Sequence, residues 1–274
     1  MLLLVVLLPL LLGTVLTAIS GRERRVLTAA MAGAITATSL GILLSYVPSV
    51  MSGTAVMEHW SWLPSLGLNI ALRLDGLSLM FAGLIMGIGL CIVLYAAYYL
   101  APEDSAPKFF SLMMLFMAAM LGVVLSDNLL VLVIFWELTS ISSFLLVGYW
   151  GHRPDARSGA RQALAVTGGG GLAMLGGFVL LGQIGGSYEI SVLATKAAEI
   201  QAHPWFGASL VLILLGALTK SAQFPFHFWL PDAMAAPTPV SAYLHSATMV
   251  KAGVFLLMRL YPILAGSGWF EIIV

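Results

Sequence analysis

The sequence predicts an all-α fold, a polytopic bundle of transmembrane helices, and its composition supports this in two ways. Hydrophobic residues make up 60% of the 274 residues and charged residues only 9%, and mean hydropathy is +1.01. Soluble domains contain about 25% charged residues, so this chain has too few charges to cover a water-exposed surface. Its 12 basic and 12 acidic residues balance, which gives no support for binding to nucleic acid.

Apolar stretches long enough to cross a membrane follow one another along the chain. A helix needs about 20 apolar residues to cross the hydrocarbon core. No basic residue precedes the first stretch, which is also too long for the apolar part of a signal peptide, so we expect a retained helix there. The rule predicts eight spans, over residues 2–20, 26–47, 76–99, 109–126, 129–150, 162–185, 206–223 and 239–261, and the start of a ninth near Trp269.

The segment 48–75 is a long connection that carries several large apolar side chains. Tryptophan is enriched where a membrane meets water, so we expect a helix that lies flat in the interface. The side chains that favour it are Trp60, Trp62, Leu66, Ile70 and Leu72. The chain therefore divides into residues 1–75, with two spans and this interfacial segment, and residues 76–274, with the remaining spans.

Two of the connections between spans are basic. Because cytoplasmic loops carry an excess of lysine and arginine, both should face the cytoplasm, and the four crossings between them are consistent with this. The N-terminus is then predicted to lie outside the cell membrane. The basic residues are Arg22, Arg24 and Arg25 after the first span, and Arg153, Arg157 and Arg161 after the fifth.

A few ionisable residues fall inside the predicted spans. A charged side chain at mid-membrane costs about 2.5–3.5 kcal/mol on insertion scales, so such residues should face one another, water or another subunit. This favours a polar path inside the bundle. The residues are Glu137, Lys220 and Lys251, with His245 near them and His227 beside a proline-rich break.

Glu137 and Lys220 each have a functional and a structural interpretation. Hydroxyl side chains follow Glu137 on the next turns, so it could relay protons or lock two helices through an ion pair. Lys220 precedes Pro225, and proline removes a backbone donor and breaks a helix. A broken helix near Lys220–Pro225 is typical of transporter ion sites. Alternatively, Lys220 could extend to the membrane surface.

Further polar residues lie around this break. His245, Thr248 and Lys251 follow at intervals of three, which places them on one face of a regular helix. That face could pass protons, or hold two helices together. Asp232 could cap the helix that follows it or pair with a basic residue of a connection, and we favour the cap. No histidine or cysteine pair has the spacing of a zinc site, so no metal is expected, and Gly168–Gly171 favours close helix packing.

Four ordered motifs in residues 74–253 resemble the antiporter-like family shared by Mrp-type sodium/proton antiporters and respiratory complex I. They begin at Leu74-Asp-Gly-Leu-Ser, Trp136-Glu-Leu-Thr-Ser, Thr219-Lys-Ser-Ala-Gln-Phe-Pro and Ala236-Pro-Thr-Pro-Val-Ser-Ala-Tyr-Leu-His. The resemblance implies that Glu137 and Lys220 form a coupled pair in a proton channel and that His245 continues its hydrophilic axis. Lys251 makes the chain most similar to the A subunits of Mrp complexes.

The family also implies what this chain lacks. Its members have about fourteen core helices in two inverted repeats of five, and residues 76–274 supply the first antiporter-like repeat but not the second broken helix. We therefore expect an N-terminal fragment, a split subunit or an incomplete reading frame.

The resemblance leads to three hypotheses about function. The first is a subunit of a multisubunit Na⁺/H⁺ antiporter in the cell membrane, which would be a secondary transporter with other membrane subunits as partners. The second is a proton-pumping membrane subunit of complex I or of a membrane-bound hydrogenase. The third is a scaffold that transports nothing. No cofactor is expected in the chain under any of them.

Overall fold

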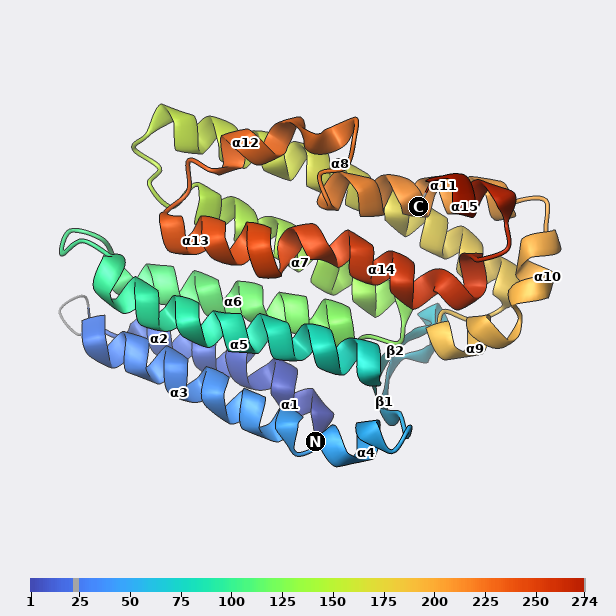
Figure 1. Cartoon of the computed structure of the whole chain (residues 1–274), viewed down its shortest axis with the longest axis horizontal. Coiled ribbons are helices and arrows are strands. Elements are labelled where there is room, and N and C mark those ends of the chain that lie inside the picture. The colour runs from blue at the N-terminus through green and yellow to red at the C-terminus, as the bar shows by residue number, and fades with distance from the viewer. Residues whose placement is uncertain (22–24, 274) are drawn as a thin grey trace.

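The protein is an elongated bundle of long helices that lie side by side (Figure 1). The computed structural model describes residues 1–21 and 25–273. Within them, seven helical stretches are long and apolar enough to cross a membrane, and α11 (Phe206–Lys220) is a shorter apolar helix. The eight predicted spans coincide with these stretches, which confirms the polytopic helical fold. The seven are Leu2–Ile19, Arg25–Met51, Gly76–Tyr99, Ala106–Leu125, Leu129–Val147, Pro154–Gly185 and Thr238–Leu264.

Several spans contain more than one element. The first comprises α1 (Leu2–Leu7), a π-helical stretch (Leu8–Gly13) and α2 (Thr14–Ile19), and the second comprises α3 (Arg25–Leu44) and α4 (Val47–Met51). The next four are α5 (Gly76–Tyr99), α6 (Ala106–Leu125), α7 (Leu129–Val147) and α8 (Pro154–Gly185). The short helices α9 (Ile190–Thr195) and α10 (Ala197–Ala202) precede α11, and α15 (Gly268–Ile273) begins where the ninth span was predicted.

Polar residues fix where the central helices start. Asp75 accepts a hydrogen bond from the backbone N–H of Ser78 and so caps α5. Asn128 accepts from the N–H groups of Leu130 and Val131 and caps α7 in the same way. Such side chains satisfy backbone donors that have no partner within the helix. Each of these two helices therefore begins at a defined residue at one end of the bundle.

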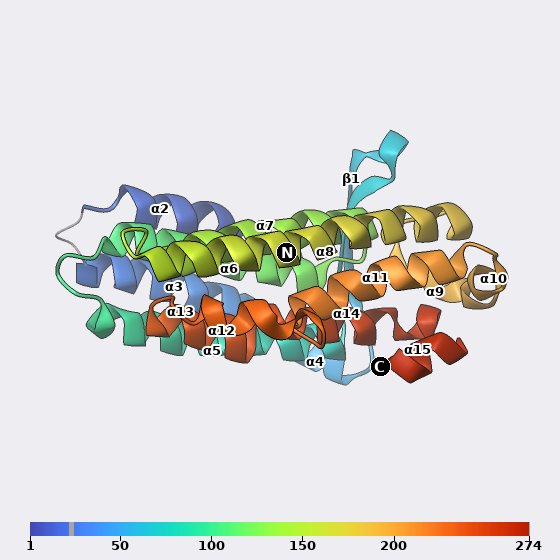
Figure 2. The same ribbon diagram turned by 90° about the horizontal axis from the view of Figure 1, so that it is seen from above.

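The predicted interfacial helix is wrong, because this segment forms a β-hairpin that projects from the bundle (Figure 2). Strands β1 (Val56–Leu63) and β2 (Leu68–Leu74) pair antiparallel around a 3-10 turn at Pro64–Leu66. Gly67 closes the turn with φ +69°, a conformation that glycine adopts without strain. Side chains alternate along β2, so Leu72 and Leu74 are buried against the helices.

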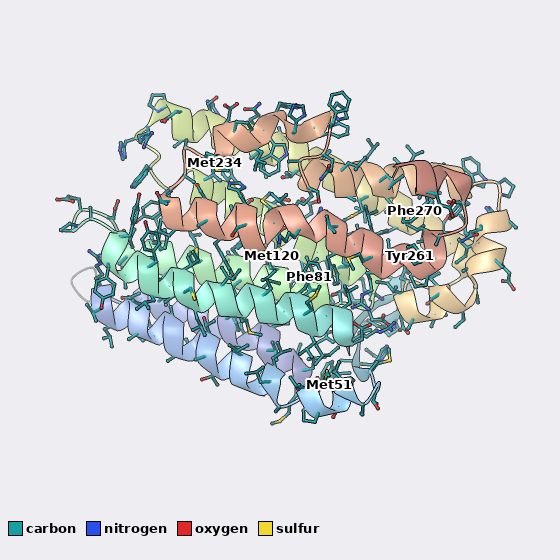
Figure 3. The ribbon with its side chains drawn as sticks, viewed as in Figure 1. Met51, Phe81, Met120, Met234, Tyr261 and Phe270 are labelled. Carbon is teal, nitrogen blue, oxygen red and sulfur yellow. The ribbon has the colours of Figure 1, made fainter. Side chains whose placement is uncertain are left out.

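Most of the interior is apolar and filled by large side chains. Figure 3 shows Phe81 and Met120 inside the bundle and Met51 at its periphery. The rings of Phe81 on α5 and Phe255 lie edge to face with centroids 5.2 Å apart. Aromatic pairs in this arrangement add to the energy of burial. Packing of this kind holds the long helices in one bundle.

The chain breaks after Lys220, as the prolines predict. Helix α11 ends at Lys220, and a 3-10 turn at Phe226–Phe228 leads into the short helix α12 (Trp229–Ala233). Helix α12 packs across α8 at Gly159, where an added Cβ atom would lie 2.2 Å from the carbonyl oxygen of Asp232. Asp232 lies inside α12 with an exposed side chain, and the following helix has no side-chain cap, so the predicted cap is wrong.

The last span is not one regular helix. It comprises α13 (Thr238–Ala242), a π-helical stretch (Tyr243–Ala247) and α14 (Met249–Leu264), with a break at Thr248. A π turn adds one residue and rotates the side chains that follow it. The prediction that His245, Thr248 and Lys251 share one helix face is therefore wrong.

The described parts of the two basic connections lie at one end of the bundle, whereas Arg22 and Arg24 lie outside the described residues. Arg25 donates to the carbonyl of Ala97 near the end of α5. The connection after α5 is joined to the one after α7, because the Trp150 indole donates to Asp104 at 2.9 Å. The β-hairpin and α9 lie at the opposite end (Figure 1). This arrangement agrees with the expectation that both basic connections face the same side.

Candidate functional site

Lys220 is completely buried at the end of α11. Its ammonium donates to the hydroxyl of Ser140 at 2.7 Å and to the carbonyl of Trp136 at 3.2 Å, both on α7. The nitrogen also lies 5.3 Å from the centroid of the Trp136 ring. The lysine thus extends into the bundle and not to the membrane surface, so the alternative of a lysine that reaches the surface is wrong.

Glu137 projects from α7 towards the glycine run of α8. An added Cβ atom at Gly171 would lie 1.8 Å from Oε1 of Glu137, and one at Gly170 would lie 1.8 Å from the hydroxyl of Thr219. The glycines therefore make room for polar side chains as well as for close packing. Oε1 of Glu137 is buried and has no hydrogen-bond partner among the described residues. Buried polar groups are normally paired, so this atom is an exception.

Lys220 contacts the turn of α7 that bears Glu137, but no hydrogen bond joins the two side chains. Both hydrogen bonds of Lys220 go to groups on α7 that flank Glu137, the carbonyl of Trp136 and the hydroxyl of Ser140. Hydroxyls on the following turns are occupied, because Thr139 donates to Trp136 O and Ser143 donates to Ser140 O. Ser140 is therefore the hydroxyl of this helix that contacts the ammonium.

His245 lies beyond a tryptophan that bonds to the end of α11. The indole of Trp229 donates to the carbonyl of Thr219, next to Lys220, at 3.0 Å. The rings of Trp229 and His245 have centroids 6.2 Å apart. Both ring nitrogens of His245 are buried and have no hydrogen-bond partner among the described residues. Trp229 therefore lies near both the end of α11 and the ring of His245.

The other predicted site residues lie elsewhere. Thr248 is buried, but its hydroxyl donates to the carbonyl of Tyr243 at 2.7 Å and so stabilises the break in the last span. Lys251 is exposed on the outside of α14. His227 is also exposed and stacks on Phe224 with centroids 5.9 Å apart. The structure thus places Lys220 against the turn of α7 that bears Glu137, connects His245 to this region through Trp229, and leaves the two exposed residues apart.

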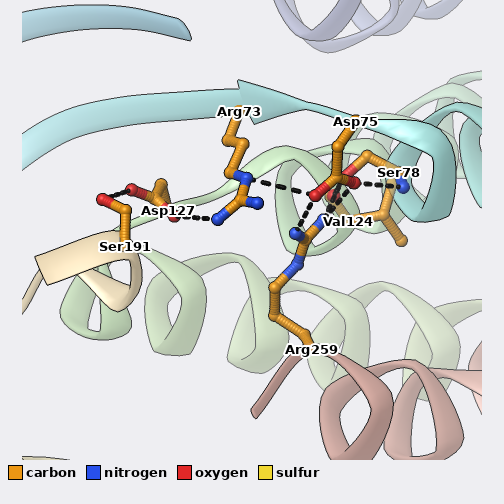
Figure 4. Close-up of polar contacts among 7 residues, drawn as sticks. All are labelled: Arg73, Asp75, Ser78, Val124, Asp127, Ser191 and Arg259. Carbon is orange, nitrogen blue, oxygen red and sulfur yellow. Dashed lines mark hydrogen bonds and ion pairs between the residues drawn. The ribbon is translucent and has the colours of Figure 1, made fainter. Parts of the chain in front are cut away.

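A second buried charge cluster was missed by the sequence analysis (Figure 4). Arg259 on α14 is 6% exposed and donates to both carboxylate oxygens of Asp75, at 2.6 and 3.0 Å, and to the hydroxyl of Ser78. Arg73 contacts the same aspartate at 3.1 Å. The signal was present, because Arg259 falls within the predicted span 239–261.

The cluster continues to Asp127, which accepts from the hydroxyl of Ser191 at 2.5 Å and lies 4.0 Å from Arg73 (Figure 4). Burial raises the pKa of Asp127 more than these partners lower it. For Asp75, burial also opposes ionisation, but the hydrogen bonds and charge of Arg259 outweigh it and hold the pKa below its ordinary value. Within this cluster, the surroundings of Asp75 therefore favour the ionised carboxylate and those of Asp127 favour the protonated carboxyl group.

Within residues 1–21 and 25–273, no group of three or more histidine, cysteine, aspartate or glutamate side chains could hold a metal ion. The buried site on α7 and α11 offers instead one carboxylate, one ammonium, hydroxyl groups and an imidazole. Groups of these kinds can accept and donate protons.

Two family models match most of the chain. The family model "NADH:quinone oxidoreductase/Mrp antiporter, TM" matches residues 126–274, and "NADH-Ubiquinone oxidoreductase (complex I), chain 5 N-terminus" matches residues 60–110. The A/B subunit of a probable K⁺/H⁺ antiporter of Rhizobium meliloti (strain 1021) is 58% identical over 88% of this chain and 24% of its own length. The A1 subunit of a Na⁺/H⁺ antiporter of Staphylococcus aureus (strain JH9) is 52% identical over 83% of this chain and 28% of its own length.

Solved structures show the same similarity. A chain of the Mrp complex from Dietzia sp. DQ12-45-1b superposes with a TM-score of 0.84 and 36% identity, over 99% of this chain and 29% of that chain. A chain of an archaeal membrane-bound sulfane sulfur reductase superposes with a TM-score of 0.81 at 22% identity, over 96% of this chain and 41% of that chain, which shows a common fold. The chain spans about a quarter of the length of the curated relatives it matches.

Proposed function

The chain belongs to the NADH:quinone oxidoreductase/Mrp antiporter transmembrane family, and we propose that it forms a proton-conducting part of a cation/proton antiporter in the cell membrane. The observation that carries this proposal is the completely buried Lys220, which meets the turn of α7 that bears Glu137. Burying a lysine inside a membrane bundle costs free energy, and ionisable residues in such positions usually have a function.

We propose that Glu137 and Lys220 exchange protons as a coupled pair. Inside a bundle the effective dielectric is low, so the charge on one group strongly changes the free energy of charging the other. Lys220 is held by Ser140 and Trp136 beside the carboxylate and not against it. A small movement of either side chain would therefore change their interaction, and with it the proton that each holds.

The proposed path continues from Lys220 to His245. Oε1 of Glu137 and both ring nitrogens of His245 are buried and unpaired among the described residues. Water is the partner that such groups accept most readily in a polar cavity. We propose that water connects them around Trp229, whose indole is fixed by Thr219.

Lys251 would carry the path to the outside of this part of the protein. It is exposed on α14, within a stretch that is apolar enough to cross the membrane. A charged side chain there should be covered by another polar surface. We propose that the remainder of a longer subunit or another membrane protein of the complex provides it. His227 and Asp232 are accessory in this scheme. We propose that the basic end of the bundle faces the cytoplasm, with the N-terminus outside.

The alternative is a proton-pumping membrane subunit of a redox-driven complex. The family includes subunits of NADH:quinone oxidoreductase, so the fold alone does not separate the two functions. The curated relatives at 52% and 58% identity are named as subunits of Na⁺/H⁺ and K⁺/H⁺ antiporters, which favours the antiporter. A scaffold without transport remains the third hypothesis, and it gives no reason for a buried lysine.

The experiment that tests this proposal determines the subunit composition of the complex and measures its proton flux. The complete protein is purified from its own membrane in mild detergent, its partners are identified by mass spectrometry, and the complex is placed in vesicles with a pH gradient. An antiporter should purify with hydrophobic membrane subunits and release protons when Na⁺ or K⁺ is added. Flavin or iron–sulfur subunits in the particle, with no proton flux driven by either cation, would support the redox-driven alternative.

A further inference from the structure

A groove of about 300 Å³ opens between α6, α7 and α8 at the basic end of the bundle. Its volume is at the lower end of the range of small-molecule pockets, about 300–1,000 Å³. The lining combines apolar side chains with cations. Phe144, Leu145 and Ala160 supply the apolar part, and Lys108, Arg157 and Arg161 supply the charges.

None of the three cations of the groove forms an ion pair with an acidic side chain of the described residues within 4.0 Å. Arg153, in the connection just before α8, differs because it pairs with Asp155. An unpaired guanidinium keeps donors in a fork that matches phosphate oxygens. The positive charge of the groove is therefore not balanced by an acidic side chain within 4.0 Å among the described residues.

Neutral groups orient these cations. The Lys108 nitrogen lies 5.4 Å from the centroid of the Tyr149 ring. Arg157 donates one hydrogen bond, to Gly151 O at 3.1 Å, and Arg161 donates one to Arg157 O at 3.3 Å. Each guanidinium has five N–H donors, so most of them stay available.

The position of the groove along the helices indicates where its ligand comes from. Helix α8 has 32 residues, which at 1.5 Å per residue is about 48 Å long and exceeds the hydrocarbon thickness of about 30 Å. Arg157 and Arg161 are the fourth and eighth residues of this helix. Because the helix is longer than the hydrocarbon core, we expect these two arginines to lie near lipid head groups and Leu145 to lie deeper along α7, before that helix ends at Val147.

We propose that this groove binds an anionic phospholipid, with its phosphate against Lys108, Arg157 and Arg161 and an acyl chain against Phe144 and Leu145. Basic pockets between membrane helices on the cytoplasmic side recognise such head groups. The inference does not depend on proton transport, because none of these residues belongs to the buried site around Lys220.

The test measures lipid binding by the complete protein in mild detergent. Native mass spectrometry compares phosphatidylglycerol with phosphatidylcholine for the wild type, for an R157Q/R161Q variant and for R153Q, whose arginine is paired and does not line the groove. We expect R157Q/R161Q to bind phosphatidylglycerol at least tenfold more weakly, phosphatidylcholine binding to stay unchanged, and R153Q to remain within about twofold of the wild type.

A second measurement uses the wild type alone, so that a folding defect in the variant cannot decide the result. Phosphatidylglycerol with a photoreactive acyl chain should label peptides that contain Phe144 or Leu145, and excess inorganic phosphate should not prevent it. Equal binding of both lipids, or labelling elsewhere only, would overturn the proposal. So would loss of a co-purifying membrane protein from R157Q/R161Q with lipid binding intact, because the groove would then be a protein interface.

Discussion

The ammonium of Lys220 donates to the hydroxyl of Ser140, 2.7 Å away on the facing helix, and not to the carboxylate of Glu137. The lysine and the glutamate are thus neighbours that interact through charge, with Ser140 holding the lysine in place. A direct ion pair would fix both charges in one state. Separation leaves each of them free to change its proton, which is what the proposed path requires.

Replacing Ser140 by alanine should slow transport. S140A removes the hydroxyl that positions the ammonium but leaves the carbonyl of Trp136, so the lysine stays buried with one partner fewer. We expect cation-driven proton flux to fall about tenfold or less, because a hydrogen bond to a charged group is worth about 1.5–3 kcal/mol and part of it is recovered from other partners. Flux in vesicles at equal protein content measures this. S142A is the control, because Ser142 donates to its own helix at Leu138 O.

Two glycines of one run should respond differently to alanine. G171A places a methyl group 1.8 Å from Oε1 of Glu137, whereas G169A meets no atom within 4 Å. The carboxylate is the end of a flexible side chain, so G171A should move Glu137 without unfolding the protein. We expect G171A to lower proton flux strongly and G169A to leave it near the wild-type value. Equal effects of the two substitutions would show that the position of Glu137 does not matter for transport.

The sequence predicts the helices well because lipid imposes a simple rule, an apolar stretch of sufficient length. It fails for Val56–Leu74, where alternating large side chains and a turn at Gly67 form a hairpin, and where the tryptophans were assigned to an interfacial helix. The break at Thr248 was also missed, because a π turn leaves no composition signal.

The residues of the candidate site could be predicted from the sequence, but the contacts between them could not. Glu137 and Lys220 are found from sequence because charges are rare inside spans. The hydrogen bond from Lys220 to Ser140 joins residues that lie 80 positions apart in the chain, so it depends on how their helices pack. Arg259 lies inside the predicted span 239–261, so the same rule identifies it as a candidate, but the rule does not predict its pairing with Asp75, 184 residues away. Pairing across such separations is set by tertiary packing.

Breaking the pair of Arg259 and Asp75 should destabilise the protein. R259Q leaves a half-buried carboxylate without its main partner, and removing one member of a buried pair typically costs about 3–5 kcal/mol. The midpoint of thermal unfolding in detergent should therefore fall, and the double variant D75N/R259Q should recover part of the loss. No change for R259Q would mean that the pair contributes nothing to stability.

The same pair predicts acid sensitivity. Because the pKa of Asp75 is lower in the folded protein than in the unfolded chain, the stability it contributes is present above the unfolded pKa, about 3.9, and is lost as pH falls through the folded value. In D75N this acid-dependent loss should be absent. Thermal unfolding measured from neutral pH down to the acid limit of the detergent complex tests the difference.

Asp127 should behave in the opposite way. Burial raises its pKa, so its ionisation destabilises the folded state as pH rises through and above the unfolded pKa of about 3.9. D127N removes that charge and still accepts from the hydroxyl of Ser191. We expect D127N to unfold a few degrees higher than the wild type at neutral pH and to lose this advantage in acid. A variant that is less stable at every pH would show that the contact with Arg73 dominates.

The most direct test of the proposed path is the proton flux of a Lys220→Met variant of the complete protein, measured in vesicles with Na⁺ or K⁺ at equal protein content. Lys196→Met is the matched control, because that lysine lies at the end of the bundle and donates to Gly185 O. We predict that K220M assembles with its partners and loses at least 90% of the flux, about 1.4 kcal/mol or more in the barrier, while K196M stays near the wild type. An assembled K220M that exchanges cations for protons at the wild-type rate would contradict the account, and a failure of K220M to assemble would favour the scaffold hypothesis.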